Sequence, residues 1–161
     1  MKKTKFLVQA AIIGAIYAVL TIALAPFSYG IMQVRVSEAL TVLPFFTPAA
    51  IPGLFIGCMV ANIYGGFGII DIVFGSLATL LAAYLSYILR KWKALVPLPP
   101  IIVNAIVIGV ILYYAFLNDP QLKAPLWAIM GWIGLGQFIS CYGLGYPLLV
   151  ILRKYKKFFD N

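Results

Sequence analysis

Long apolar stretches alternate with short polar connections along the chain. Five stretches carry no charged residue, and they cover residues 6–34, 39–70, 72–89, 94–118 and 124–152. A helix that crosses ~30 Å of hydrocarbon needs roughly 20 residues. The first, third, fourth and fifth stretches therefore each predict one membrane-spanning helix.

The second stretch is long enough for two helices, but prolines interrupt it at Pro44, Pro48 and Pro52. Proline removes a helix donor and disfavours helical conformation at the residue before it. One kinked helix and two short helices both fit this pattern.

The basic residues favour two helices here, and hence six spans. With six, both termini share one side of the membrane, which then carries ten of the twelve lysines and arginines. Only Arg35 and Lys123 lie on the other side. Because cytoplasmic segments are enriched in basic residues, both termini are predicted to be cytoplasmic.

The predicted fold is thus a single-domain, all-α integral membrane protein over residues 1–161. The second and third spans are short, so they should be irregular or sheltered by neighbouring helices. The predicted spans cover residues 6–25, 36–46, 48–65, 69–89, 97–117 and 125–152.

Composition agrees with a lipid environment. Hydrophobic residues make up 64% of the chain and charged residues 10%, whereas a soluble domain is about 25% charged. The net charge of +8 does not indicate nucleic-acid binding, because the basic residues form short clusters at the ends of apolar runs.

The chain lacks the residues that metal binding, acid–base catalysis and ATP binding usually require. The chain has no histidine and two cysteines, Cys58 and Cys141, both inside apolar runs, so neither a metal site nor an enzyme is predicted. It also lacks a P-loop motif, so ATP binding by this chain is not expected.

Polar groups are costly in a membrane and therefore indicate function. In the six-span topology, one group of them approaches the outer face, which predicts a ligand pocket open to that side. This group is Gln33, Arg35, Glu38, Asn62, Tyr64 and Asp71, and Asn104 and Gln137 lie within the fifth and sixth spans.

Each of these residues also has a structural interpretation. Arg35 and Glu38 could form a plain ion pair, and Asp71 could cap a helix. Asn104 and Gln137 could join two helices by a hydrogen bond.

Small residues line the first predicted helix. Ala10, Gly14 and Ala18 recur every four residues, and Ala11 and Ala15 form an adjacent pair. Such faces permit close helix–helix approach, either within this chain or with another membrane subunit.

Several segments resemble the QueT family, and the resemblance extends over residues 5–152. The central segments are 34–44 (VRVSEALTVLP), 62–66 (NIYGG), 68–71 (GIID) and 75–80 (GSLATL). Asn104-Ala105 in the fifth span is also similar, and the match in the sixth span, Gly136-Gln137 and 145–149 (GYPLL), is looser.

The resemblance implies a substrate-binding (S) component of an energy-coupling factor (ECF) transporter in a prokaryotic plasma membrane. Its implied ligand is a queuosine precursor, a 7-deazaguanine. The implied partners are a transmembrane coupling subunit and two cytoplasmic ATPases, so this chain itself needs no cofactor. The implied docking element is A-x-x-x-A on the first helix, which Ala11 to Ala15 match, and the implied mechanism is toppling of the loaded subunit in the membrane.

This ligand suggests roles for the polar residues. A carboxylate can accept from the N–H and amino group of a guanine-like edge, which we assign to Glu38 with Arg35 orienting it. Asp71 would bind an aminomethyl ammonium, and the two carboxylates could exchange roles. Amides would come from Asn62, Asn104 and Gln137, and stacking aromatic rings from Tyr64, Trp127 or Trp132, although both tryptophans also suit an interfacial belt.

Two other functions fit the same residues. One is an S component for a different vitamin-like solute. The other is a self-sufficient transporter that couples uptake to an ion gradient through Glu38 or Asp71.

Overall fold

The computed structural model describes residues 2–29, 33–115 and 124–155, and every regular element within them is helical. The first half contains α1 (Lys2–Ala23), α2 (Ala25–Ser28), η1 (Val36–Phe45) and α3 (Ala50–Gly65). The second half contains η2 (Asp71–Gly75), α4 (Ser76–Ile88), η3 (Leu89–Lys91), η4 (Lys93–Leu95), α5 (Leu98–Ala115), α6 (Leu126–Phe138), η5 (Ile139–Gly145) and α7 (Tyr146–Arg153).

Within the described residues, four helical runs are long and apolar enough to cross a membrane. They are Lys3–Ala23, Asp71–Lys91, Lys93–Ala115 and Leu126–Arg153. Two shorter apolar helices, Val36–Phe45 and Ala50–Gly65, lie where the second and third spans were predicted. An all-helical chain with four membrane-length helices is therefore confirmed, and passage of the two short helices through the membrane stays a prediction.

The proline-rich stretch forms two helices rather than one kinked helix. The first, η1, is a 3-10 helix that contains Pro44 and ends at Phe45, and α3 starts at Ala50. A 3-10 helix rises about 2 Å per residue, against about 1.5 Å in an α-helix, so η1 reaches further than its length suggests. Seven of its ten residues are buried, which agrees with the expectation of an irregular, sheltered segment.

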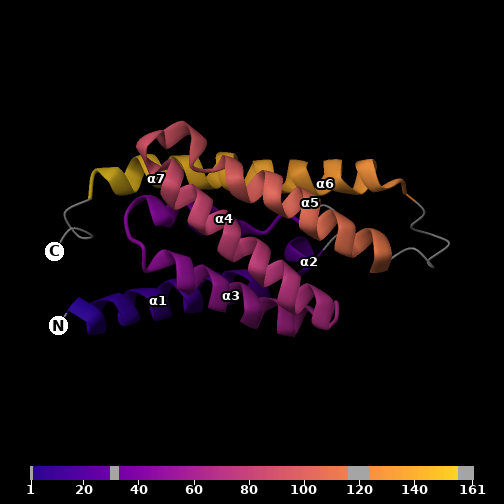
Figure 1. Ribbon diagram of the computed structural model, residues 1–161, viewed down its shortest axis with the longest axis horizontal. Helices are drawn as coiled ribbons and strands as arrows, with labels where there is room; N and C mark the ends of the chain where they lie inside the picture. Colours follow the sequence, from indigo (N-terminus) through magenta and orange to yellow (C-terminus); the bar gives the residue numbers. More distant parts are fainter. Residues whose placement is uncertain (1, 30–32, 116–123, 156–161) are drawn as a thin grey trace.

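Helices α1 and α3 pack with their backbones in close contact, side by side in Figure 1. A Cβ atom added to Gly53 would lie 2.6 Å from the carbonyl oxygen of Ala10, and one added to Gly57 would lie 2.6 Å from that of Gly14. Small residues allow this approach where lipid offers no hydrophobic driving force. Ala10, Gly14 and Ala18 of the small-residue face are buried, so part of that face serves packing within this chain.

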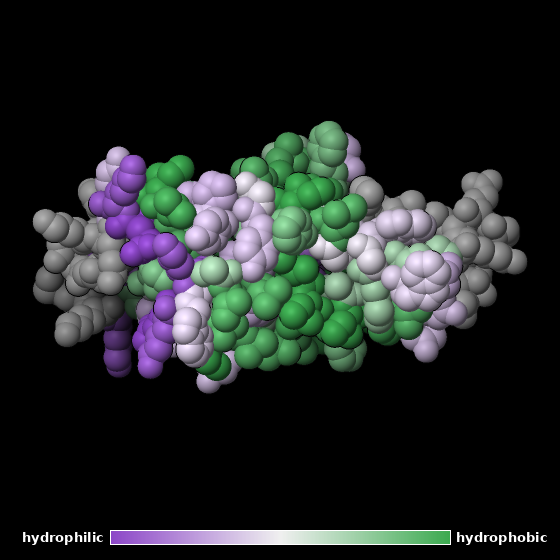
Figure 2. Space-filling view, turned by 90° about the horizontal axis from the view of Figure 1, so that it is seen from above, coloured by the Kyte–Doolittle hydropathy of each residue, from purple (hydrophilic) through white to green (hydrophobic). Residues whose placement is uncertain are grey.

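The polar and apolar surfaces are separated along the bundle. The first turns of α1, the η3–η4 connection and the end of α7 lie at the same end of the molecule (Figure 1). Figure 2 shows hydrophilic side chains gathered at that end and a hydrophobic band over the middle. This distribution fits a bundle whose middle contacts lipid.

Candidate ligand-binding site

A cluster of polar side chains lies buried where α1, η1, α3 and η2 meet. The Tyr17 hydroxyl donates to Glu38 Oε1 at 2.5 Å, and Arg35 Nη1 donates to Asn62 Oδ1 at 3.1 Å. Asn62 Nδ2 in turn donates to the Asp71 carbonyl oxygen at 3.2 Å. All five side chains are at most 3% exposed, so we call them the polar cluster.

The polar cluster continues into the C-terminal helices through Glu38. The Cys141 thiol of η5 lies 3.8 Å from the Glu38 carbonyl oxygen and 3.8 Å from Gln137 Oε1. Asn104 Nδ2 of α5 donates to Gln137 Oε1 at 3.2 Å. The amide pair thus joins two helices, which agrees with the structural interpretation of these residues, and Cys141 links it to the backbone carbonyl of Glu38.

Several polar atoms of this region are buried and find no hydrogen-bond partner among the described residues. The donors among them are Gln33 Nε2 and Arg35 Nη2, and the acceptors are Glu38 Oε2, Asp71 Oδ2 and Asn104 Oδ1. A buried polar atom left unpaired costs about 1–3 kcal/mol, and more when it is charged. These atoms include both donors and acceptors, so the region is a candidate site for a compact polar ligand that offers both.

Local backbone geometry brings these groups inward. Gln33 adopts a positive φ of 44° just before η1, a conformation that is uncommon outside glycine. Asp71 opens one π-helical segment and Cys141 lies in the other, and such segments occur often at functional sites. A Cβ atom on Gly75 would lie 2.9 Å from Asn62 Nδ2 and 3.0 Å from Asp71 Oδ1, so this glycine makes room for both side chains.

Two expected partnerships differ in the structure. Within the described residues no ion pair joins Arg35 to Glu38, because the guanidinium turns toward Asn62 and Tyr17 orients the carboxylate instead. Asp71 is the first residue inside η2, and Ile70 occupies its N-cap position, which argues against the simple helix-cap interpretation.

The aromatic residues proposed for stacking are not part of the polar cluster. Tyr64 is 62% exposed, Trp127 76% and Trp132 39%. Their rings lie on the outside of helices, where amphipathic aromatic side chains suit the membrane interface. The stacking assignment is therefore not supported, and the interfacial alternative fits Trp127 and Trp132.

Two members of the buried network were missed from the sequence. Tyr17 is fully buried and contacts Glu38, and Cys58 lies 3.2 Å from the Thr79 hydroxyl and 3.5 Å from Asn62 Nδ2. A buried tyrosine usually needs a hydrogen-bond partner. A tyrosine hydroxyl in the middle of an apolar helix is the sequence signal that could have identified Tyr17.

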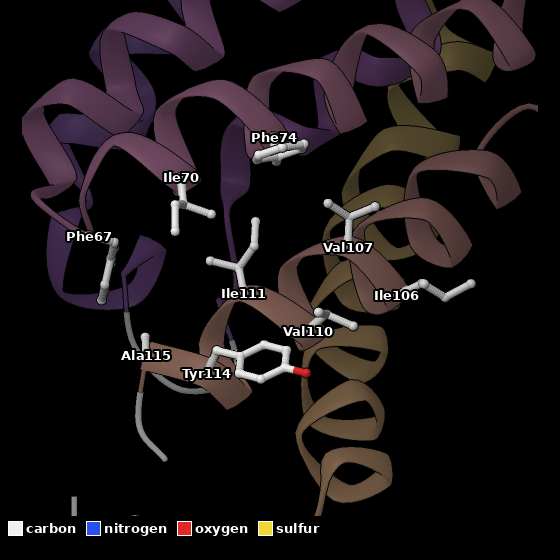
Figure 3. A pocket seen from close by; sticks show the side chains of 9 residues that line it. All are labelled: Phe67, Ile70, Phe74, Ile106, Val107, Val110, Ile111, Tyr114 and Ala115. Carbon is white, nitrogen blue, oxygen red and sulfur yellow. The ribbon is translucent and has the colours of Figure 1, made fainter. Parts of the chain in front are cut away.

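An apolar cavity of about 620 Å³ lies between residues 67–74, which include most of η2, and the second half of α5. Figure 3 shows its lining of aliphatic and aromatic side chains from the two sides, with the Tyr114 hydroxyl as the one polar side-chain group among the residues drawn. Its lining offers a polar ligand few hydrogen-bond partners, so the polar cluster is the stronger candidate for a polar site.

The described features define a helical membrane protein with an internal polar site. A family model described as QueT transporter matches residues 7–154, and the chain belongs to this family. The resemblance seen in the sequence is confirmed, and the family is one of transporters.

A curated relative matches the chain over part of its length. The chain is 40% identical over 93 residues to the queuosine precursor transporter QueT of Lactococcus lactis subsp. cremoris (strain MG1363). The matched region covers 55% of this chain and 54% of the relative, so the chain spans about half the length of that protein. No solved structure matches the chain.

Proposed function

We propose that this chain is the S component of an ECF transporter in a prokaryotic plasma membrane. It captures a queuosine precursor of the 7-deazaguanine type from outside and does not catalyse a reaction. Support comes from the buried, unpaired donors and acceptors around Glu38 and Asp71, together with membership of the QueT transporter family.

The unpaired atoms complement a guanine-like base. Glu38 Oε2 accepts from the N–H and amino edge, and a free donor such as Arg35 Nη2 binds the carbonyl oxygen. Asn104 Oδ1 accepts a ring N–H, and Asp71 Oδ2 binds an aminomethyl ammonium. Arg35 thus contacts the ligand in addition to fixing Asn62.

Mass spectrometry of small molecules that copurify with the chain tests this proposal. A 7-deazaguanine should be recovered, and calorimetry should give tighter binding for deazaguanines than for riboflavin, folate or biotin. Preferential binding of one of those vitamins would identify an S component for a different solute.

Asp71→Asn is expected to weaken only ligands that carry an ammonium. The substitution keeps the size of this buried side chain but removes its charge, and a hydrogen bond to a charged group contributes about 1.5–3 kcal/mol. Affinity for the aminomethyl precursor should fall about ten- to a hundredfold, while affinity for the nitrile precursor should hold in calorimetric titration. Equal losses for both ligands would give Asp71 a structural role.

The proposed partners are a transmembrane coupling subunit and two cytoplasmic ATPases, which hydrolyse the ATP. The coupling subunit docks on the outer side of α1, where Ala11 and Ala15 are exposed. These two residues line an apolar groove of about 590 Å³, whose other wall includes Pro52, Ile56 and Val60 of α3. The groove leaves space for small-residue contacts with a partner helix. The loaded subunit then topples to release the ligand inward.

The six-span topology predicts that both ends of the chain face the cytoplasm. Lys3→Cys and Lys154→Cys should each resist a membrane-impermeant maleimide in intact cells and react after permeabilisation. Both native cysteines are buried, so the unsubstituted chain serves as the background. Labelling of either site in intact cells would overturn this topology.

A self-sufficient ion-coupled transporter is the second candidate, because buried carboxylates in membranes often carry protons and Glu38 and Asp71 each have an unpaired oxygen. Uptake by the purified chain in liposomes under a proton gradient would favour it. Uptake only with the coupling subunit, the ATPases and ATP supports the S component.

A further inference from the structure

A pocket of about 400 Å³ with basic lining lies at the end of the molecule that carries the described chain ends. The connection between α4 and α5 supplies most of its lining, and α7 and η1 supply the rest. Its lining residues are Arg90, Lys91, Lys93 and Arg153, with Phe45, Trp92 and Ala94 as the apolar part. We call it the basic pocket.

The basic pocket has no counter-charge in the part of the chain that the structure describes. The acidic side chains there are Glu38 and Asp71, and both are buried in the polar cluster. Four cations around one pocket repel each other, and no ion pair within the described ranges relieves them. An anion bound between them would do so.

The connection that carries three of the four cations is tied to the bundle. The Ser86 hydroxyl donates to the Val96 carbonyl oxygen at 2.8 Å, and the Tyr142 hydroxyl donates to that of Ala94 at 2.7 Å. The Arg90 guanidinium carbon lies 4.0 Å from the centre of the Tyr87 ring, a cation–π distance. The cationic side chains therefore project from a fixed backbone.

The position along the helices points to a lipid. One membrane-length run ends at Lys91 and the next begins at Lys93, which places these cations at headgroup depth. Trp92 is 60% exposed and Leu95 39% exposed beside them, so apolar surface adjoins the charges. Free phosphate would use the charges but not this apolar surface.

We propose that the basic pocket binds the phosphate of an anionic phospholipid headgroup, with the acyl chains along the adjoining apolar side chains. Basic pockets at the ends of membrane helices suit such headgroups, and each lysine or arginine near an anionic surface adds to the attraction. This site is separate from the polar cluster, so the inference does not depend on the proposed ligand.

Native mass spectrometry of the full chain, extracted from vesicles of phosphatidylcholine with a minor share of phosphatidylglycerol, tests the proposal. The triple variant Arg90→Gln, Lys93→Gln and Arg153→Gln should retain about tenfold less phosphatidylglycerol than the unsubstituted chain. The control variant Lys3→Gln, Lys5→Gln and Lys154→Gln removes as much charge at the same end and should retain it. Equal loss in both variants would mean diffuse attraction and overturn the site.

A second measurement does not need the triple variant. Trp127→Phe with Trp132→Phe leaves Trp92 as the remaining one of three tryptophans. Brominated phosphatidylglycerol should then quench Trp92 more strongly than brominated phosphatidylcholine at the same fraction, and millimolar inorganic phosphate should not relieve the difference. Equal quenching by the two lipids, or full relief by phosphate, would overturn the lipid assignment.

Discussion

Glu38→Gln is expected to weaken binding of every ligand with a guanine-type edge about ten- to a hundredfold. The carboxylate is 1% exposed, Oε1 accepts from Tyr17, and Oε2 has no partner. The amide replaces one acceptor oxygen with a donor, so it loses either the Tyr17 contact or the contact with the ligand edge. Calorimetric titration with the aminomethyl and nitrile precursors measures the loss, which should be the same for both.

Tyr17→Phe is the matched variant, since it keeps the carboxylate and removes only the hydroxyl that orients it. The ligand keeps its own hydrogen bond to the carboxylate in this variant, so the affinity should fall less than in Glu38→Gln and without preference between ligands. If Glu38→Gln leaves both affinities unchanged, the base edge is read elsewhere, and Asn104 and Gln137 become the first candidates.

The helical segments could be predicted from the sequence because lipid imposes length and polarity together. The second predicted span, 36–46, corresponds to Val36–Phe45, and the fifth, 97–117, corresponds to Leu98–Ala115. The type of helix that each segment forms was harder to predict from the sequence. Neither the 3-10 geometry of η1 nor the π-helical turns at Asp71 and Cys141 has a local sequence signature, because both depend on packing against neighbouring helices.

The polar cluster was predictable in part for a similar reason. Arg35, Glu38, Asn62 and Asp71 stood out because unpaired polar groups are costly in a membrane, and the structure buries all four. The side of the helix that each aromatic residue occupies was not predictable. A helix that is apolar all round gives no amphipathic signal to show which side faces the interior. Trp127 thus lies outside the cluster and Tyr17 inside it.

The small residues of α1 show the same limit at finer scale. Successive residues of an α-helix are rotated by about 100°, so Ala10 and Gly14 point to a different side from Ala11 and Ala15. The sequence could not tell which pair packs inside. The structure buries the first pair against α3 and exposes the second.

Ala15→Trp or Ala11→Trp is expected to abolish ATP-driven uptake while ligand binding by the isolated chain remains. Both alanines are exposed, so an indole fits without disturbing the bundle, yet it would hold a docking helix away from the groove. Contacts between membrane helices depend on close backbone approach at small residues. Uptake by the reconstituted complex and calorimetry of the isolated chain measure the two properties separately.

Gly14→Leu is the matched variant on the packed face of the same helix. A Cβ atom there would lie 2.8 Å from the Gly53 carbonyl oxygen, so the larger side chain must separate α1 from α3 and lower the thermal stability of the isolated chain. Ligand binding should fall with it, because Tyr17 of α1 orients Glu38. If Ala15→Trp instead behaves like Gly14→Leu and loses binding and uptake together, the exposed side of α1 supports the fold and docking must use another surface. If Ala15→Trp keeps both, the coupling subunit does not contact α1 at this position.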